Sequence, residues 1–148
     1  MIRIFLDANV LIDIIADAPR PSSAHSRALY AYLIQHPDRY TLYTSCDLFT
    51  TVYYVLNRAG ADRREILNSL KSINRLVNVM KFGRDEIDEA IYLMEKNPAF
   101  EDLEDTIQFV MARNQRCDYI VTNDRAFFSH DIPLLGSGEA LEVLQSRD

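Results

Sequence analysis

Two periodic patterns of hydrophobic positions alternate along the chain. Short apolar runs rich in β-branched and aromatic residues predict strands, and apolar positions three and four residues apart predict helices. The predicted strands are Ile2–Leu6, Tyr40–Thr44, Leu76–Met80, Cys117–Val121 and Ile132–Leu135. The predicted helices are Asn9–Ala16, Ser22 or Ser23 to about Gln35, Asp47–Arg58, Asp62–Ser72, Asp85–Glu95, Glu101–Arg113 and a terminal helix of about eight residues after Gly136-Ser137-Gly138. Because strands alternate with helices, the pattern predicts an α/β fold, a three-layer sandwich with a central parallel sheet.

Each predicted helix has an apolar stripe that we expect to face the core. The residues placed inward include Ala24, Ala28, Val55, Leu67, Ile91 and Leu103. The helix Asp47–Arg58 has a second stripe that faces solvent or a cleft. It consists of Asp47, Thr51, Tyr54 and Arg58. The segment Ala18-Pro19-Arg20-Pro21 ends the first helix, because proline cannot continue one.

Composition limits the classes of protein to consider. The chain has 148 residues and 48% of them are hydrophobic, so we expect a single domain over residues 1–148 with one sizeable core. Sixteen basic against 22 acidic residues give a net charge of −6, so a nucleic-acid partner would need a local basic patch or bridging metal ions. Cys46 and Cys117 make no disulfide framework, and neither a signal peptide nor a membrane span is apparent. We therefore expect a soluble cytoplasmic protein.

Acidic residues follow three of the predicted strands. Asp7 follows the first strand, Asp47 the second, and Asp124 the strand that ends at Val121. The carboxyl ends of parallel strands lie at one edge of the sheet, so these residues should converge there, and Asp105 joins them if its helix begins nearby. Carboxylates at close range repel one another, and a divalent cation removes that repulsion. A site rich in oxygen and free of histidine suits Mg²⁺ or Mn²⁺.

Other charged residues have simpler interpretations. We expect Asp13 on a polar edge of its helix, and Asp102 and Glu104 in solvent, where acids favour a helix amino terminus. Four arginines are candidate phosphate contacts if they line the cleft. They are Arg20, Arg27, Arg58 and Arg125.

Four sequence segments together resemble the PIN domain family. They are D-A-N-V-L-I-D, V-Y-Y-V-L, E-D-L-E-D-T-I-Q and D-Y-I-V-T-N-D-R-A-F, in this order. The resemblance implies a parallel sheet of about five strands between helices. It also implies a metal-dependent ribonuclease, which is the activity of PIN domains. Many small bacterial members resemble VapC-type toxins of toxin–antitoxin pairs, so the resemblance further implies a toxin.

The resemblance also assigns residues to roles. Asp7, Asp105 and Asp124 would be the catalytic, metal-binding acids, and Asn9 and Thr122 match the supporting polar positions of the family. Thr51 and Asn123 are further supporting candidates. The family usually has a glutamate directly before the segment that matches V-Y-Y-V-L, where this chain has Thr51. Asp47 lies one turn earlier on the same stripe and could compensate. Its side chain is one methylene shorter and starts about 6 Å away along the helix.

Three functional interpretations remain open from the sequence. The first is a Mg²⁺- or Mn²⁺-dependent endoribonuclease that an antitoxin protein inhibits, acting as a homodimer as the family and the tyrosine-rich helices suggest; these tyrosines are Tyr30, Tyr32, Tyr53 and Tyr54. The second is a non-catalytic PIN module that binds RNA or a protein partner, which Thr51 favours. The third is a phosphoacceptor domain, disfavoured because Asn9 stands where a phosphatase needs an aspartate and 120–128 contains no lysine for a receiver.

Overall fold

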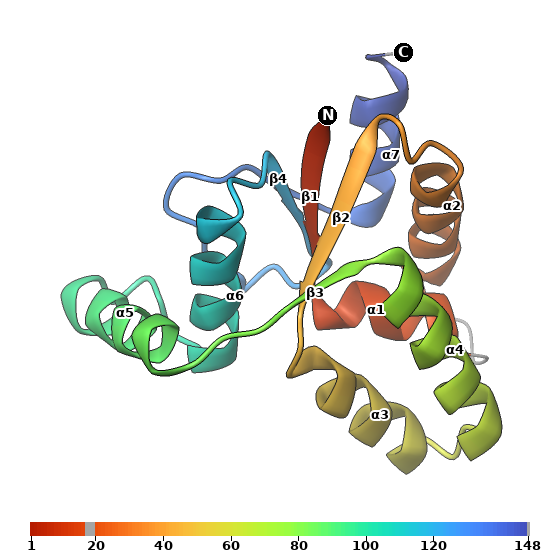
Figure 1. Cartoon of the computed structure of the whole chain (residues 1–148), viewed down its shortest axis with the longest axis horizontal. Coiled ribbons are helices and arrows are strands. Elements are labelled where there is room, and N and C mark those ends of the chain that lie inside the picture. Colours follow the sequence, from red (N-terminus) through yellow and green to blue (C-terminus); the bar gives the residue numbers. More distant parts are fainter. Residues whose placement is uncertain (17–19, 148) are drawn as a thin grey trace.

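The computed structural model describes residues 1–16 and 20–147 and contains a fully parallel sheet (Figure 1). Its strand order is β3-β2-β1-β4-β5. The strands are β1 Ile2–Leu6, β2 Tyr40–Ser45, β3 Asn78–Met80, β4 Tyr119–Val121 and β5 Leu134–Leu135. Pairing on both sides of β1 places it at the centre, where Ile4 aligns with Leu42 of β2 and with Tyr119 of β4.

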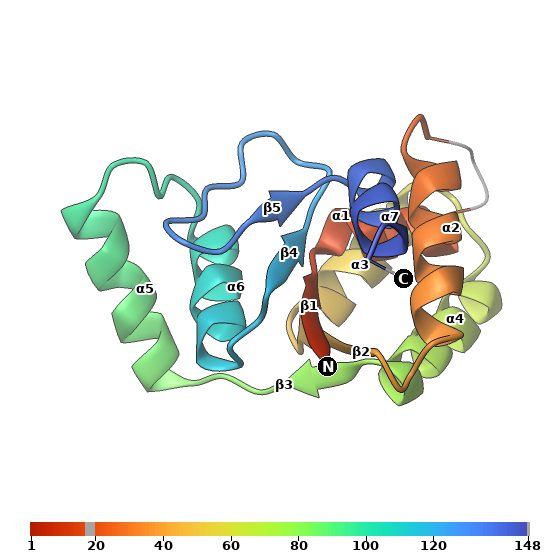
Figure 2. The same cartoon turned by 90° about the horizontal axis from the view of Figure 1, so that it is seen from above.

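Helices cover both faces of this sheet. They are α1 Ala8–Ile15, α2 Ser23–Ile34, α3 Leu48–Arg58, α4 Arg63–Leu76, α5 Arg84–Lys96, α6 Leu103–Asn114 and α7 Ser137–Gln145. Figures 1 and 2 show α5 and α6 on one side of the sheet and α1, α2, α4 and α7 on the other, while α3 extends from the carboxyl end of β2. This confirms the predicted three-layer α/β/α sandwich.

The helix predicted to end at Ser72 continues to Leu76, and it shortens the third predicted strand. Leu76 belongs to α4, and β3 spans only Asn78–Met80. The buried stripe of α4 continues through Ile73, whose carbonyl accepts a hydrogen bond from the backbone N–H of Val77 and so completes the last turn. Leu76 is exposed on the outer side of that turn, so the apolar run from Leu76 spans a helix end and a strand.

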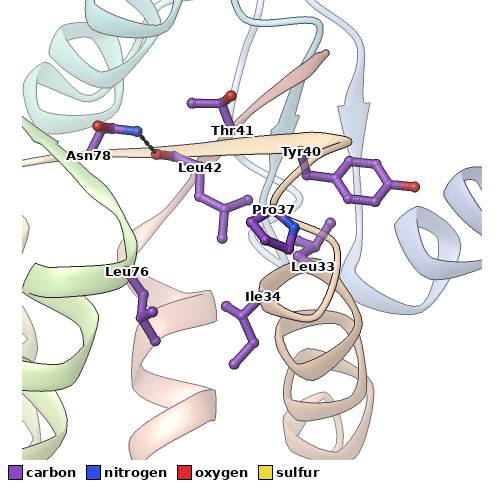
Figure 3. A pocket seen from close by; sticks show the side chains of 8 residues that line it. All are labelled: Leu33, Ile34, Pro37, Tyr40, Thr41, Leu42, Leu76 and Asn78. Carbon is purple, nitrogen blue, oxygen red and sulfur yellow. Dashed lines mark hydrogen bonds between the residues drawn. The ribbon is translucent and has the colours of Figure 1, made fainter.

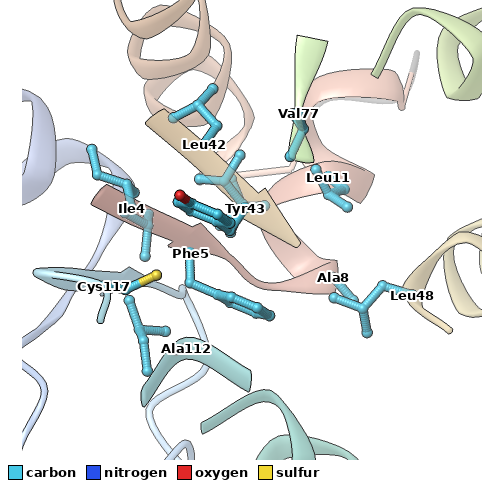
Figure 4. Packing of buried hydrophobic residues seen from close by; sticks show 14 of the residues in the cluster. Ile4, Phe5, Ala8, Leu11, Leu42, Tyr43, Leu48, Val77, Ala112 and Cys117 are labelled. Carbon is cyan, nitrogen blue, oxygen red and sulfur yellow. The ribbon is translucent and has the colours of Figure 1, made fainter. Parts of the chain in front are cut away.

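The core surrounds the central strand (Figure 4). Ile4 and Phe5 point to opposite faces of β1 and are fully buried, as a strand covered on both sides requires. Figure 4 shows Leu11 of α1 and Ala112 of α6 among the side chains packed around them. Rigid packing of β1 fixes the position of Asp7, the residue that follows it.

Several residues predicted to face inward are exposed instead. They are Ala24, Ala28, Val55, Leu67, Ile91 and Leu103. In α2 the buried face contains Ser23 and Ser26. Ser23 Oγ accepts from the backbone N–H of Arg20 at 3.0 Å, and Ser26 Oγ takes part in a buried polar network described below. The first predicted helix break is only partly described, since Ala18 and Pro19 lie outside the described residues.

A hollow of about 230 Å³ opens beside the amino-terminal half of β2 (Figure 3). Its lining is mainly apolar and includes Leu33, Ile34 and Leu42. It lies away from the carboxyl ends of the strands and has no acidic side chain in its lining, so it is separate from the acidic cluster. Among the described residues, we find no helix with the length and hydrophobicity needed to cross a bilayer.

Candidate active site

Asp7 lies at the junction of β1 and α1 and is only 3% exposed. Its backbone N–H donates to the carbonyl of Val121 at 3.1 Å, which extends the pairing of β1 with β4. Its carboxylate caps α1 by accepting from the N–H of Ala8 at 2.6 Å. The same carboxylate accepts from Asn9 Nδ2 and from Thr122 Oγ1, both at 2.8 Å. Asp7 is therefore held rigidly at the carboxyl edge of the sheet.

Asp105 and Asp124 reach the same edge from different elements. Helix α6 begins at Leu103, so Asp105 lies in its first turn. Asp124 follows β4, where its N–H donates to Thr122 Oγ1 at 3.1 Å and its carboxylate accepts from the N–H of Ala126 at 2.9 Å. Asp105 is close enough to interact electrostatically with both Asp7 and Asp124, and Asp7 also interacts with Asp124.

Burial and mutual repulsion disfavour negative charge on these carboxyls. Burial raises the pKa of Asp7, and the Asp124 charge adds to this, whereas hydrogen bonding from Thr122, the Ala8 N–H and Gln108 lowers the pKa in part. Burial is also the largest cause that raises the pKa of Asp105 to about 7, followed by the charges of Asp7, Asp102, Asp124 and Glu104. A divalent cation at this edge would relieve the repulsion and favour the ionised forms.

Asn9, Thr122 and Asn123 join the loops around Asp7 and Asp124. Thr122 Oγ1 donates to Asp7 and accepts the N–H of Asp124, so one hydroxyl connects both acids. Asn9 donates to Asp7, and its Oδ1 accepts the N–H of Asn123 at 3.0 Å. Asn123 directs its side-chain amide away from the acids and into the protein interior. These contacts set the path of the chain on either side of Asp124.

The interior partner of Asn123 is Asp13, which is fully buried rather than on a polar edge of its helix. One oxygen of Asp13 accepts from Ser22 Oγ at 2.6 Å, Ser26 Oγ at 2.9 Å and Asn123 Nδ2 at 3.1 Å. The other oxygen lies 3.3 Å from Arg20 Nε. The expectation failed because these donors come from the next helix along the chain, at its start, and from the loop after β4, which is 110 residues away.

A contact between α3 and α6 brings a further acid to the site. Thr51 Oγ1 donates to Glu104 Oε2 at 3.5 Å across 53 residues of sequence. Burial raises the pKa of Glu104, and the charges of Asp47, Asp102 and Asp7 raise it further. Glu104 is therefore not a purely solvated helix-terminal acid, which corrects the sequence expectation. Asp102 is exposed, and it caps α6 by accepting from the N–H of Asp105 at 2.9 Å.

Asp47 and three of the candidate arginines make contacts within or next to their own elements. Asp47 stands at the amino terminus of α3, where its carboxylate accepts from Ser45 and makes no capping bond. Arg20 pairs with Asp13, and Arg27 donates to the carbonyl of Ala16. Arg58 donates to the Tyr54 hydroxyl at 2.7 Å, at the end of α3 that lies about 16 Å from Asp47.

Arg125 is the candidate arginine that adjoins the acids. It lines a cleft of about 490 Å³ together with Thr122, Asn123 and Asp124. The other lining residues are Ser22, Phe127, Leu134, Leu135, Gly136 and Glu139. A phosphate in this cleft would lie beside both a guanidinium and Asp124.

Gln108, one turn after Glu104 on α6, is a buried polar residue that sequence reasoning missed. It is 0% exposed, and its amide lies near enough to Asp7 to lower the pKa of that carboxyl. Neither amide atom reaches hydrogen-bond geometry with another described residue. A buried amide without a partner is costly, so this space is suited to a polar ligand.

No group of three histidine, cysteine, aspartate or glutamate side chains within residues 1–16 and 20–147 is already arranged to hold a metal ion. The donors at the carboxyl edge are all oxygens on short side chains, which suits Mg²⁺ or Mn²⁺. Asp124 is exposed and Asp105 half-buried, so neither side chain is fully enclosed by packing. The ligand chemistry of these residues thus fits a divalent cation, and their carboxylates would have to move closer together to coordinate it.

Comparison with known proteins identifies the fold family. The PIN domain family model matches residues 3–126, which is most of the chain. The chain belongs to the PIN domain family. It is 39% identical over 140 residues to "Ribonuclease VapC1" of Aquifex aeolicus (strain VF5), and the match covers 95% of this chain and 94% of that protein.

Solved PIN structures share the fold at low sequence identity. The crystal structure of VapC20 of Mycobacterium tuberculosis, titled a Sarcin-Ricin loop cleaving toxin, has a TM-score of 0.69 at 17% identity and covers 84% of this chain and 92% of its own. A toxin–antitoxin complex from Klebsiella pneumoniae has a TM-score of 0.62 at 17% identity, with coverage of 90% and 96%. Membership of the PIN family sets aside the phosphoacceptor interpretation.

Proposed function

We propose that this PIN protein is a Mg²⁺- or Mn²⁺-dependent endoribonuclease and the toxin of a toxin–antitoxin pair. The observation that carries the proposal is the convergence of Asp7, Asp105 and Asp124 from β1, α6 and β4 at one edge of the sheet. Family membership and the 39% identity to Ribonuclease VapC1 support RNA as the substrate. The protein would act in the cytoplasm.

Asp7, Asp105 and Asp124 would hold the metal, with Asp47 as a more distant candidate. A bound Mg²⁺ or Mn²⁺ supplies a Lewis acid that polarises a phosphodiester and lowers the pKa of a bound water. Thr122 and Asn9 orient the carboxylate of Asp7, and Thr122 also fixes the backbone of Asp124. Burial and the neighbouring charges raise the pKa of Asp105 to about 7, so the metal-free protein would carry this proton only part of the time at neutral pH, and a bound cation would favour the ionised form.

The RNA strand would approach along the cleft beside Asp124. Arg125 lines this cleft and can donate to a non-bridging phosphate oxygen. The acidic charge of the chain would otherwise repel RNA, so the metal and Arg125 together supply the local attraction.

RNA cleavage tests the proposal directly. We expect RNA cleavage to require Mg²⁺ or Mn²⁺ and to stop with a chelator. Asp7→Asn should lower the rate at least about 100-fold, because it removes the most rigidly held ligand. Glu101→Gln removes an equal charge from an exposed position just before α6 and is the matched control. Metal-independent cleavage, or full activity in Asp7→Asn, would contradict the proposal. Metal binding without cleavage of any RNA would favour the non-catalytic module instead.

The proposed partners are an antitoxin and a second copy of this chain. The structural similarity to a toxin–antitoxin complex supports the first. Helices α3 and α4 pack together and carry exposed apolar side chains, which supports a homodimer; these are Tyr54, Val55, Leu67 and Leu76. Sedimentation of the wild type should give a dimer, and Val55→Asp with Leu67→Asp a monomer. A monomeric wild type would overturn the dimer.

A further inference from the structure

We propose that Glu104 supplies the fourth carboxylate of the metal site, reaching across from α6 to replace the acid that α3 lacks at Thr51. The inference rests on the proposed function, since it assigns a further ligand to the same site. In this protein α6, and not α3, would then supply the fourth carboxylate. The site then remains complete for metal binding despite Thr51.

The contact between Thr51 and Glu104 provides the geometry. Thr51 Oγ1 donates to Glu104 Oε2 at 3.5 Å, so the carboxylate lies against the face of α3 on which Thr51 stands. That is the helix position at which the family pattern expects a glutamate. A threonine leaves more room there than a glutamate would, and its hydroxyl offers a donor. Thr51 is thus a positioning residue for the carboxylate of Glu104.

The surroundings of Glu104 distinguish it from an ordinary helix-terminal acid. An acid that merely favours the amino terminus of α6 can remain in solvent, as the exposed Asp102 does. Glu104 is instead half-buried and close enough to Asp7 and Asp47 to interact with both charges. Among the described residues, no arginine or lysine forms an ion pair with it. Placing a carboxylate there is unfavourable unless a cation joins it.

Gln108 is an independent indication of a ligand in this space. It lies on α6 one turn after Glu104 and is fully buried near Asp7, whose pKa its weak hydrogen bonding lowers, while neither amide atom makes a hydrogen bond of normal geometry with a described residue. An amide buried in this way is stabilised when a polar ligand, such as a water held in the site, reaches it. Glu104, Asp105 and Gln108 therefore present one side of α6 to Asp7.

Calorimetric titration of the full-length protein with Mn²⁺ alone tests the assignment without relying on activity. We expect Glu104→Gln to weaken Mn²⁺ binding at least about tenfold, and the control Glu101→Gln to bind like wild type. Thr51→Val keeps the side-chain volume but removes the hydroxyl, so it should weaken binding less. The double variant Thr51→Glu with Glu104→Gln returns the carboxylate to α3 and should recover most of the affinity.

The outcomes separate this inference from the function on which it rests. If wild type binds Mn²⁺, Asp7→Asn does not, and Glu104→Gln binds like Glu101→Gln, the role of Glu104 is wrong and the proposed function stands. If wild type fails to bind Mn²⁺ at all, the proposed metal-dependent function fails first. Circular dichroism of each variant shows that it is folded. If Glu104→Gln unfolds, the Mn²⁺ affinity of the double variant becomes the test. Recovered affinity supports the inference, and a double variant that binds Mn²⁺ as weakly as Asp7→Asn overturns it.

Discussion

Asp7 and Asp13 are buried carboxylates at the two ends of the same sequence motif, and their surroundings differ. Asp13 is fully buried, and the groups around its carboxylate are donors or a cation, namely Ser22, Ser26, Asn123 and Arg20. Asp7 has donors on one side, but the carboxylates of Asp105 and Asp124 lie on the other.

The difference separates a structural acid from a functional one. A buried charge that the protein compensates internally stabilises the fold and needs no ligand. A buried charge that faces further charges of the same sign destabilises the metal-free protein, and such an arrangement is typical of a site awaiting a cation. The two networks meet at the Asn9–Asn123 hydrogen bond, so the compensated acid also supports the loop that carries Asp124.

Removal of Asp13 should have the largest effect on stability. Asp13→Ala leaves Ser22, Ser26, Asn123 and Arg20 without their common acceptor, and loss of one partner of a buried charged network costs about 3–5 kcal/mol. For a chain of this size we expect the melting temperature to fall by about 10 °C, measured by circular dichroism in chelator.

Asp7→Asn is the matched comparison for Asp13→Ala. It keeps most of the local hydrogen bonds and removes a charge that repels Asp105 and Asp124, so its unfolding free energy should stay within about 1 kcal/mol of wild type. Equal destabilisation by the two substitutions would show that the two acids do not differ in the way described.

The pH dependence of stability should reveal the uncompensated cluster next. The pKa of Asp105 is about 7 in the folded protein and has an ordinary value of 3.8. The folded state therefore binds this proton more tightly, and the stability that the proton confers is complete below the ordinary value and lost as pH rises through about 7. In chelator, the melting temperature of wild type relative to Asp105→Asn should fall by a few degrees between about pH 5 and about pH 8.

Metal and a second variant provide the controls for this measurement. Saturating Mn²⁺ should remove the decrease in wild type, because the cation stabilises the ionised carboxylates. Asp85→Asn changes an exposed acid in the first turn of α5 and should leave the pH dependence as it is in wild type. A flat profile for wild type in chelator would mean that the acids do not repel one another appreciably.

The sequence predicted well what depends on local periodicity. The parallel strands and the placement of Asp7 and Asp124 at the carboxyl edge follow from alternating strands and helices, because that topology has few alternatives. Asp105 joins them because α6 begins at Leu103, which is the condition on which its placement depended. The position of Leu76 was wrong because one apolar run spans the end of α4 and the start of β3. Exposed Val55 and Leu67 show that an apolar stripe does not reveal how much of it neighbouring elements cover.

Local periodicity could not predict the burial and contacts of residues whose neighbours lie in other segments of the chain. Glu104 has the local signature of a helix-terminal acid, and its contact with Thr51 crosses 53 residues of sequence. Asp13 resembled a solvated helix acid because its donors lie on α2 and after β4. The sequence placed Ser22 at the start of a helix and gave Ser26 no role, whereas both hydroxyls donate to Asp13. Long-range polar contacts, not periodicity, thus distinguish the two acidic networks.

The smallest expected effect comes from the outer part of the compensated network. Ser137 Oγ accepts from Asn123 Nδ2 at 2.9 Å and shares a hydrogen bond with Ser26 Oγ at 2.7 Å. Ser137→Ala removes both contacts but leaves Asp13 its own donors, so we expect a loss of about 1 kcal/mol in unfolding free energy, measured by urea denaturation. Ser146→Ala, after α7, removes an exposed hydroxyl that donates to the carbonyl of Val143 and should be nearly neutral. If Ser137→Ala lowers the unfolding free energy as much as Asp13→Ala does, the network is disrupted as one unit. A small loss instead identifies the buried charge of Asp13 as the group that contributes most to its stability.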